Sequence, residues 1–163
     1  INSAKRIYIL GVRSSAALAS FLYFYLNPVF FFLFLVDTSS ASEMFEQMFR
    51  ISENDVCVAI SFPRYSKQTI NALRFINDRG TKIIAITDSD ESPIAEYADT
   101  LLVAKSDMVS VVDSLVAPLS LINALVVAVT FSRREEVYNN FNKLESIWDE
   151  YQVYDKADGV NNG

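Results

Sequence analysis

The chain has 163 residues, of which 51% are apolar, so it is long enough to fold as one domain around its own core. Its 14 basic and 20 acidic residues give a net charge of -6, which argues against direct binding of DNA or RNA by this stretch. The single cysteine, Cys57, excludes an internal disulfide and favours a cytoplasmic location. The chain has no histidine, the commonest general acid–base group and metal ligand, and we expect no metal and no cofactor.

Short apolar runs rich in β-branched residues alternate with helical patterns, which predicts a layered α/β fold. In chain order the predicted elements are a strand at Lys5–Leu10, a helix to about Leu26, a strand at Val29–Val36, a helix from Ser40 to about Phe49, a strand at Val56–Ile60, a helix through Ile70–Ile76, a strand at Lys82–Ile86, a short helix from Ser92, a strand at Thr100–Ala104, and helices at Val109–Phe131 and Arg133–Tyr151. Ser40 and Glu43 have the spacing of a capping box, and Pro93 suits a first helical turn.

The stretch Ala16–Val36 is nearly uncharged and has about 20 residues, the length that a membrane span needs. Asn27-Pro28 interrupts it, and proline disfavours helical geometry in the residue before it. The pieces on either side are each too short to cross a bilayer. We therefore expect a buried helix followed by a strand.

The unit Asp55–Ser89 organises the sequence, because two apolar strands flank an amphipathic helix that ends near Gly80. Strands joined in this way lie parallel with a right-handed crossover. Five such strands predict a three-layer αβα sandwich with a parallel sheet in the flavodoxin-like order 2-1-3-4-5. That order reverses between the first and third strands, so the loops after them face each other across one crevice.

The loops around this crevice carry hydroxyl groups and cations. Gly11–Ser15 follows the first strand, Thr38-Ser39 the second, and Ser61–Ser66 the third. Helix amino termini at such loops offer N–H groups and a partial positive charge, which suits a phosphate. The residues that we expect to bind an anion are Arg13, Ser14, Ser15, Thr38, Ser39, Ser61, Arg64 and Ser66.

Simpler interpretations exist for several of these residues. Ser66 can cap the next helix, and Arg64 can be a solvated loop charge. Asp37 can be a turn residue or a ribose acceptor, but the dinucleotide fingerprint is broken because Arg13 stands in place of its second glycine. A phosphoacceptor receiver domain shares the strand order, yet it needs an aspartate where Ser61 stands.

Together these motifs resemble those of the sugar isomerase (SIS) domain family. Gly11, Ser14 and Ser15 match the family's first-loop pattern Gly-x-Gly-x-Ser apart from the second glycine. Ser61–Ser66 stands where the family has Ser-x-Ser-Gly-x-Thr, with Pro63-Arg64 in place of the middle Ser-Gly. The two arginines are therefore departures that supply charge, or narrow the pocket, where a glycine backbone usually comes close to the ligand.

The later sequence strengthens the resemblance. Ala85–Ser89, Ser92–Ala95 and Ala98-Asp99 are similar to the family's run "AITD…SPLA…AD", and the resemblance covers about Lys5–Phe131. Within the family, the chain is most similar to the effector-binding half of RpiR-type bacterial transcription regulators. In these, a helix-turn-helix domain precedes an SIS domain that senses a phosphorylated sugar.

This resemblance implies a cytoplasmic, non-catalytic phosphosugar sensor of carbohydrate metabolism. It implies that Ser15, Ser61 and Ser66 contact the phosphate. A helix-turn-helix domain is expected before this chain but absent from it, so DNA would be contacted only through that missing domain. We expect no membrane partner.

An aldose–ketose sugar-phosphate isomerase is the alternative. That reaction moves a proton between adjacent carbons and needs a base near C1 and C2 of the sugar. SIS isomerases commonly use glutamate and histidine, and this chain has no histidine. Glu43 and Glu46 are candidate bases, although both also complement a helix dipole, so we expect a binding protein rather than an enzyme.

The C-terminal part is expected to combine core and interface. Val109–Phe131 is apolar nearly all round, as in a helix that covers the sheet on one side and packs against a second subunit on another. The aromatic positions of the last helix favour core or interface. We expect a single domain over residues 1–152, a homodimer or tetramer, and a polar, disordered tail over residues 153–163.

Overall fold

One parallel sheet forms the centre of the molecule in the computed structural model, which describes residues 1–38, 40–106 and 114–154. Its strands are β1 (Ile7–Leu10), β2 (Leu33–Val36), β3 (Val56–Ile60), β4 (Lys82–Thr87) and β5 (Thr100–Val103). All four neighbouring pairs are parallel, and the order is β2-β1-β3-β4-β5. The predicted sheet and strand order are confirmed.

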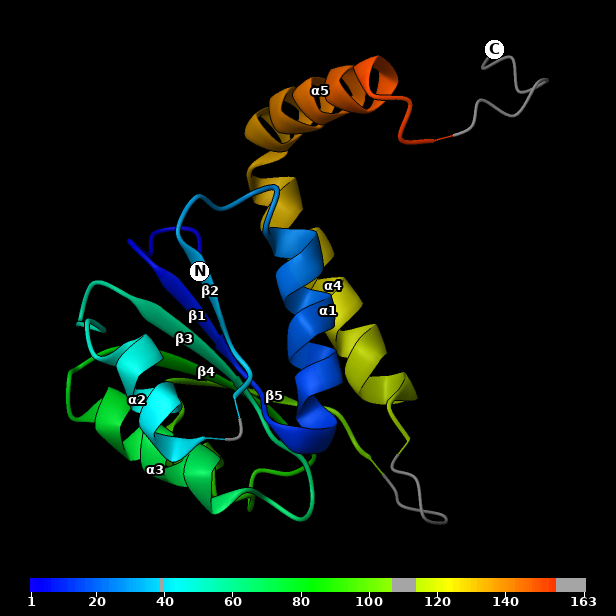
Figure 1. Ribbon diagram of the computed structural model, residues 1–163. Coiled ribbons are helices and arrows are strands. Elements are labelled where there is room, and N and C mark those ends of the chain that lie inside the picture. Colours follow the sequence, from blue (N-terminus) through cyan, green and yellow to red (C-terminus); the bar gives the residue numbers. More distant parts are fainter. Residues whose placement is uncertain (39, 107–113, 155–163) are drawn as a thin grey trace.

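The helices cover both faces of this sheet. They are α1 (Ala16–Leu26), α2 (Ala41–Met48), α3 (Lys67–Asn77), α4 (Val116–Ser132) and α5 (Arg134–Glu150), with short 3-10 turns η1 (Arg13–Ser15) and η2 (Ala95–Tyr97). Figure 1 shows α1 and α4 on one face, and α2 and α3 on the other. The predicted three-layer sandwich is therefore confirmed.

Successive strand residues point to opposite faces of the sheet, so the strands contribute to two hydrophobic cores, one on each face. Ile7 and Ile9 pack with Leu18 and Leu22 of α1 on one face of the sheet. Tyr8 and Leu10 point to the opposite face, as successive strand residues do, and pack in the second cluster, to which α2 and α3 contribute. Every residue of β1 and β3 is buried, because both strands are covered on both sides.

Two predicted elements are shorter than expected. β2 begins at Leu33 rather than Val29, because the amides of Val29 and Phe30 donate to the carbonyl of Leu26 and close a turn after α1. The short helix expected from Ser92 is only the 3-10 turn η2. It ends early because the chain must join β5, where the Asp99 amide donates to the Ile83 carbonyl at 2.9 Å.

The start of α4 also differs from the prediction. Residues 109–113 of the predicted helix lie outside the described residues, and Ser114 and Leu115 precede α4 in non-helical geometry. Pro118 therefore occupies the first turn of α4 rather than its interior. A proline is tolerated there because its missing N–H would have no partner within the helix.

The stretch Ala16–Val36 forms a helix and a strand as predicted, but it is not wholly buried. Phe24, Phe31 and Phe32 are exposed, Phe31 by 98%.

α5 stands away from the sheet (Figure 1) and buries none of its residues, so its aromatic side chains do not form core within one copy. Within the described residues no single helix is long and apolar enough to cross a membrane. α4 and α5 together have the necessary length and composition, but the pair is bent by 98°.

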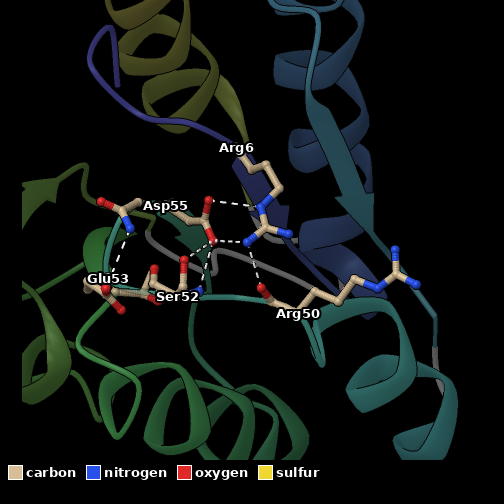
Figure 2. A network of polar contacts seen from close by, with 7 residues as sticks. Arg6, Arg50, Ser52, Glu53 and Asp55 are labelled. Carbon is tan, nitrogen blue, oxygen red and sulfur yellow. Dashed lines mark hydrogen bonds and ion pairs between the residues drawn. The ribbon is translucent and has the colours of Figure 1, made fainter.

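A polar network holds the amino ends of β1 and β3 together, at the edge of the sheet where these strands begin (Figure 2). Arg6 donates to both carboxylate oxygens of Asp55, from Nε at 3.0 Å and Nη2 at 2.8 Å. The amide and hydroxyl of Ser52 donate to Asp55 Oδ2 at 2.8 and 3.0 Å. Arg6 also donates to the Arg50 carbonyl at 2.6 Å, so one guanidinium joins β1 to the chain before β3.

Candidate functional site

A cavity of about 190 Å³ lies at the opposite edge, where β1 and β3 end and the strand order reverses. Its lining residues come from the loops after these strands and from the starts of the following helices: Val12, Arg13, Ser14, Ser15, Ser61, Phe62, Arg64, Ser66 and Thr69. The structure therefore brings six of the eight predicted site residues into one cavity. Thr38 does not line it, and Ser39 lies outside the described residues.

Gly11 allows the first loop to turn directly into η1 and α1. A Cβ at this position would lie 2.7 Å from Ala19 Cβ and 2.8 Å from the Ser15 carbonyl oxygen, too close for any side chain. The close packing brings Ser15, which is 5% exposed, to the floor of the cavity. The N-cap residues of η1 and α1 make no side-chain capping hydrogen bond. The backbone N–H groups at this helix start therefore have no side-chain acceptor from the N-cap residue.

The second loop contributes Ser61 and the start of α3. Ser61 directly follows β3 and is 4% exposed. Ser66 is the N-cap residue of α3 with extended backbone angles, yet its side chain makes no capping hydrogen bond. The capping role that competes with anion binding at Ser66 is thus not used in this structure.

Thr69 is a lining residue that the sequence did not single out. It lies in the first turn of α3, is 1% exposed, and its hydroxyl has no hydrogen-bond partner in the described part of the chain. A buried hydroxyl without a partner is unfavourable unless a ligand or water supplies one. The available signal was the spacing of Thr69, Leu73 and Ile76, which places a polar side chain on the buried face of α3.

The described residues of the lining are rich in hydrogen-bond donors. The hydroxyls of Ser14, Ser15, Ser61, Ser66 and Thr69 make no hydrogen bond to another described residue. Arg13 and Arg64 are the charged residues among the described part of the lining, which includes no carboxylate. Hydroxyls, helix amino termini and guanidinium groups together suit a phosphate.

Both arginines have left-handed backbone geometry. The φ angle is 57° at Arg13 and 69° at Arg64, in the region that favours glycine. Both side chains are exposed and lie at the mouth of the cavity, whereas Ser15, Ser61 and Thr69 are buried.

Tyr65 fixes the second loop against the end of β4. Its hydroxyl donates to Asp88 Oδ1 at 2.6 Å, and the Thr87 hydroxyl donates to the same oxygen at 3.1 Å. Burial and the neighbouring Asp88 raise the pKa of Tyr65 to about 12, so the phenol stays protonated at neutral pH. Asp88 is thereby held by two donors outside the cavity.

The residues after β2 have a local role. The Ser40 hydroxyl accepts from the Glu43 amide at 3.5 Å, which confirms the predicted cap of α2. In a capping box the Glu43 carboxylate would accept from the Ser40 amide. Here the Thr38 hydroxyl lies between them: it accepts from the Ser40 amide and donates to the Glu43 carboxylate. Glu43 and Glu46, the candidate bases, do not line the cavity.

A larger depression, of about 790 Å³, lies at the bend between α4 and α5. Glu135 and Glu136 line it beside Arg133 and Arg134, and Arg133 is already paired with Glu136 at 2.6 Å. The acids in this lining make the larger depression unfavourable for an anion. No cluster of three His, Cys, Asp or Glu residues in the described ranges is placed to hold a metal ion.

Comparison with known proteins gives matches over most of the chain. An uncharacterized HTH-type transcriptional regulator of Haemophilus influenzae is 32% identical over 104 residues, which are 63% of this chain and 35% of the regulator. The chain thus spans about a third of that curated relative.

Solved structures share the fold. The sugar isomerase domain of an RpiR transcription factor from Sphaerobacter thermophilus is 26% identical, with a TM-score of 0.81 over 88% of this chain and 80% of that one. The NanR protein of Vibrio vulnificus, solved in complex with ManNAc-6P, is 19% identical, with a TM-score of 0.76 over 91% of this chain and 57% of that one. The family model of the SIS domain matches residues 1–128, so this chain belongs to the SIS domain family.

Proposed function

We propose that this chain is the effector-binding domain of an RpiR-type bacterial transcription regulator, and that it binds a phosphorylated sugar in the cavity between the ends of β1 and β3. The observation that carries the proposal is the lining of that cavity. Five hydroxyls, two helix amino termini and two guanidinium groups meet there, and the lining residues that the structure describes include no carboxylate. These hydrogen-bond donors and positive charges would stabilise an anion.

The depth of the side chains suggests how the ligand lies. Ser15, Ser61 and Thr69 are buried at the floor, so they would donate to the phosphate oxygens together with Ser66 at the start of α3. Ser14 and the two arginines are exposed at the mouth. Thr38 and Ser39, also predicted to bind, belong to the loop after β2, and in this proposal they contact the sugar rather than the phosphate.

The relatives support a regulatory role. The Haemophilus relative and the Sphaerobacter structure are both described as transcription regulators, and NanR was solved with a sugar phosphate. In our proposal a helix-turn-helix domain outside this chain contacts DNA in the cytoplasm, and residues 1–152 form one effector domain. The sugar phosphate acts by favouring one arrangement of the subunits over another.

The isomerase alternative finds no catalytic base among the cavity residues that the structure describes. Isomerisation of a sugar phosphate needs a group that takes a proton from carbon next to the carbonyl. The lining residues described by the structure include neither glutamate nor aspartate, and the chain has no histidine. We therefore favour a sensor over an isomerase.

A thermal-shift screen tests this function. Hexose, pentose, amino-sugar and N-acetylated sugar phosphates are compared with the corresponding free sugars. A ligand that binds only the folded chain raises the Tm with its concentration. We expect a shift from a phosphorylated sugar, none from its free sugar, and no turnover on prolonged incubation. Turnover would establish the isomerase instead, and no shift from any sugar phosphate would contradict the proposed ligand class.

A further inference from the structure

We propose that Tyr65 is a positioning residue, whose hydrogen bond to Asp88 holds the loop after β3 in the conformation that binds the ligand. Ser61 and Ser66 are the hydroxyl residues of this loop in the cavity, and Tyr65 lies between them in the sequence. This inference rests on the proposed function, because it concerns the same cavity. It goes further in giving a role in binding to two residues that are not among the described lining residues.

The loop from Ser61 to Tyr65 is bound to the end of β4 at both of its ends. At its start the Ser61 amide donates to the Ile86 carbonyl at 3.1 Å, which continues the pairing of β3 with β4. At its end the Tyr65 hydroxyl donates to Asp88 Oδ1 at 2.6 Å. Thr87, which is fully buried, donates to the same oxygen at 3.1 Å and thereby ties the acceptor to the sheet.

Between these two bonds the backbone has a conformation that its residue does not favour. Arg64 has a φ of 69°, in the left-handed region where an L-side chain is strained. Residues in such geometry persist where the surrounding structure holds them. Arg64 directly precedes Tyr65, so the bond from the phenol to Asp88 holds the chain immediately after the strained residue.

The hydrogen bond is strong enough for this role. Its acceptor is a carboxylate, and hydrogen bonds to ionised groups are shorter and roughly twice as strong as neutral ones. Both side chains are half-buried, which limits the competition from water. Burial and the neighbouring Asp88 raise the pKa of Tyr65 to about 12, so the phenol remains a donor at neutral pH.

Substitutions at Asp88 distinguish positioning from a purely electrostatic effect. A carboxylate near the cavity repels an anion, so its removal alone would raise the affinity for an anion. Positioning predicts the opposite, because the apparent affinity falls with the fraction of chains that have the binding conformation. Asp88→Ala removes both the charge and the acceptor. Asp88→Asn removes the charge but keeps a side-chain oxygen that accepts from Tyr65.

Inorganic phosphate is the probe, because its use does not require the natural sugar to be known. Binding at pH 7 is followed through the NMR shifts of the backbone amides at residues 11–15, which lie outside the substituted loop. We expect Tyr65→Phe and Asp88→Ala each to lower the affinity for phosphate by about tenfold. The double variant should lose no more than either single variant, because both remove the same bond. Asp88→Asn should keep the wild-type affinity or exceed it.

Tyr97→Phe is the matched control. Tyr97 is a half-buried tyrosine of η2 that interacts with Arg74 of α3, and it is not among the described lining residues. This variant loses the same hydroxyl group without touching the loop, so we expect it to bind phosphate as wild type does. We also expect Tyr65→Phe to keep a Tm close to that of wild type, whereas a merely structural role would lower the Tm and leave the affinity of the folded chain unchanged.

The outcomes separate the two proposals. Wild-type affinity in Tyr65→Phe, increased affinity in Asp88→Ala, or equal losses in Tyr65→Phe and Tyr97→Phe would overturn this inference and leave the proposed function intact. If phosphate shifted none of these amides in the wild-type chain, the proposed function and this inference would both fail.

Discussion

Ser40 and Ser66 show how the same residue type at the same position serves different purposes. Both are N-cap residues with extended backbone angles, at the starts of α2 and α3. The hydroxyl of Ser40 accepts from the third amide of its helix, whereas the hydroxyl of Ser66 makes no capping bond and lines the cavity. We propose that the uncapped Ser66 hydroxyl and the buried, unpartnered Thr69 hydroxyl in the same cavity serve ligand binding.

Asp55 illustrates a structural charge at the residue scale. It is the single charged residue that is fully buried among those the structure describes. Burial raises the pKa of its carboxyl, but the hydrogen bonds from Arg6 and Ser52 outweigh burial, and the net shift of the pKa is downward. Its stabilising contribution is therefore present above the unfolded pKa of about 3.9 and is lost as the pH falls through the lower folded pKa.

Asp55→Asn should lower the free energy of unfolding at pH 7 by about 3 kcal/mol. This is the low end for a buried pair, because the Arg6 side chain remains 22% exposed. The amide removes the charge and turns one acceptor into a donor that faces Arg6. Urea unfolding at pH 7 measures the change, and the difference between variant and wild type should shrink below about pH 4.

Asp99→Asn is the control for this prediction. Asp99 pairs with Lys82 at 2.6 Å, but both side chains are substantially exposed. Exposed pairs contribute little, so we expect a loss of at most about 1 kcal/mol. A similar loss in both variants would show that burial of Asp55 is not the cause.

At the scale of elements, α4 and α5 stand out because each leaves an apolar surface uncovered. Of the 17 residues of α4, Pro118, Ile122 and Val129 are buried, although the helix is apolar nearly all round. Val127 and Phe131 are exposed by 64% and 69%, and the groove beside them is continued by residues of α5. A second copy of this chain is the partner that we propose for this face, since soluble oligomers most often pair the same surface of two copies.

Phe131→Glu combined with Phe141→Glu tests this face. Both side chains are exposed and line the groove between α4 and α5, so the substitutions should not disturb the core. We expect wild type to sediment as a dimer or tetramer and the double variant as a monomer with a nearly unchanged circular dichroism spectrum. The control is Phe49→Glu, an exposed phenylalanine at the end of α2 on the other side of the sheet. A monomeric wild type, or an associated double variant, would contradict the proposed face.

At the scale of the whole molecule, the sheet was predictable because local sequence patterns and general rules of chain connection determine it. Short buried strands separated by helices must run parallel, and the right-handed crossover leaves few strand orders. The start of β2 was wrong in the prediction because Val29 and Phe30 continue the turn after α1 by donating to the nearby Leu26 carbonyl. The extent of η2 was wrong because it depends on a distant acceptor, the carbonyl of Ile83. The predicted tail from Asp155 lies outside the described residues.

The site followed from the strand order, which brings the loops after β1 and β3 together. The role of Thr38 could not be foreseen, because its hydroxyl bonds to Ser40 and Glu43 within its own loop. The left-handed backbone geometry of Arg13 and Arg64 was not predicted from the sequence, because an arginine does not indicate a positive φ. The two family glycines that they replace were the available signal.

Calorimetric titration with the phosphosugar that gives the largest thermal shift tests most directly whether a sugar phosphate binds between the ends of β1 and β3. Wild type is compared with Ser61→Ala combined with Ser66→Ala, and with Ser20→Ala on the exposed side of α1 as the control. Losing two hydrogen bonds to a charged ligand should lower affinity by about 100-fold or more. We expect that loss in the double variant alone, with its Tm in the absence of ligand close to that of wild type. Unchanged affinity in the double variant would place the ligand elsewhere and contradict the account.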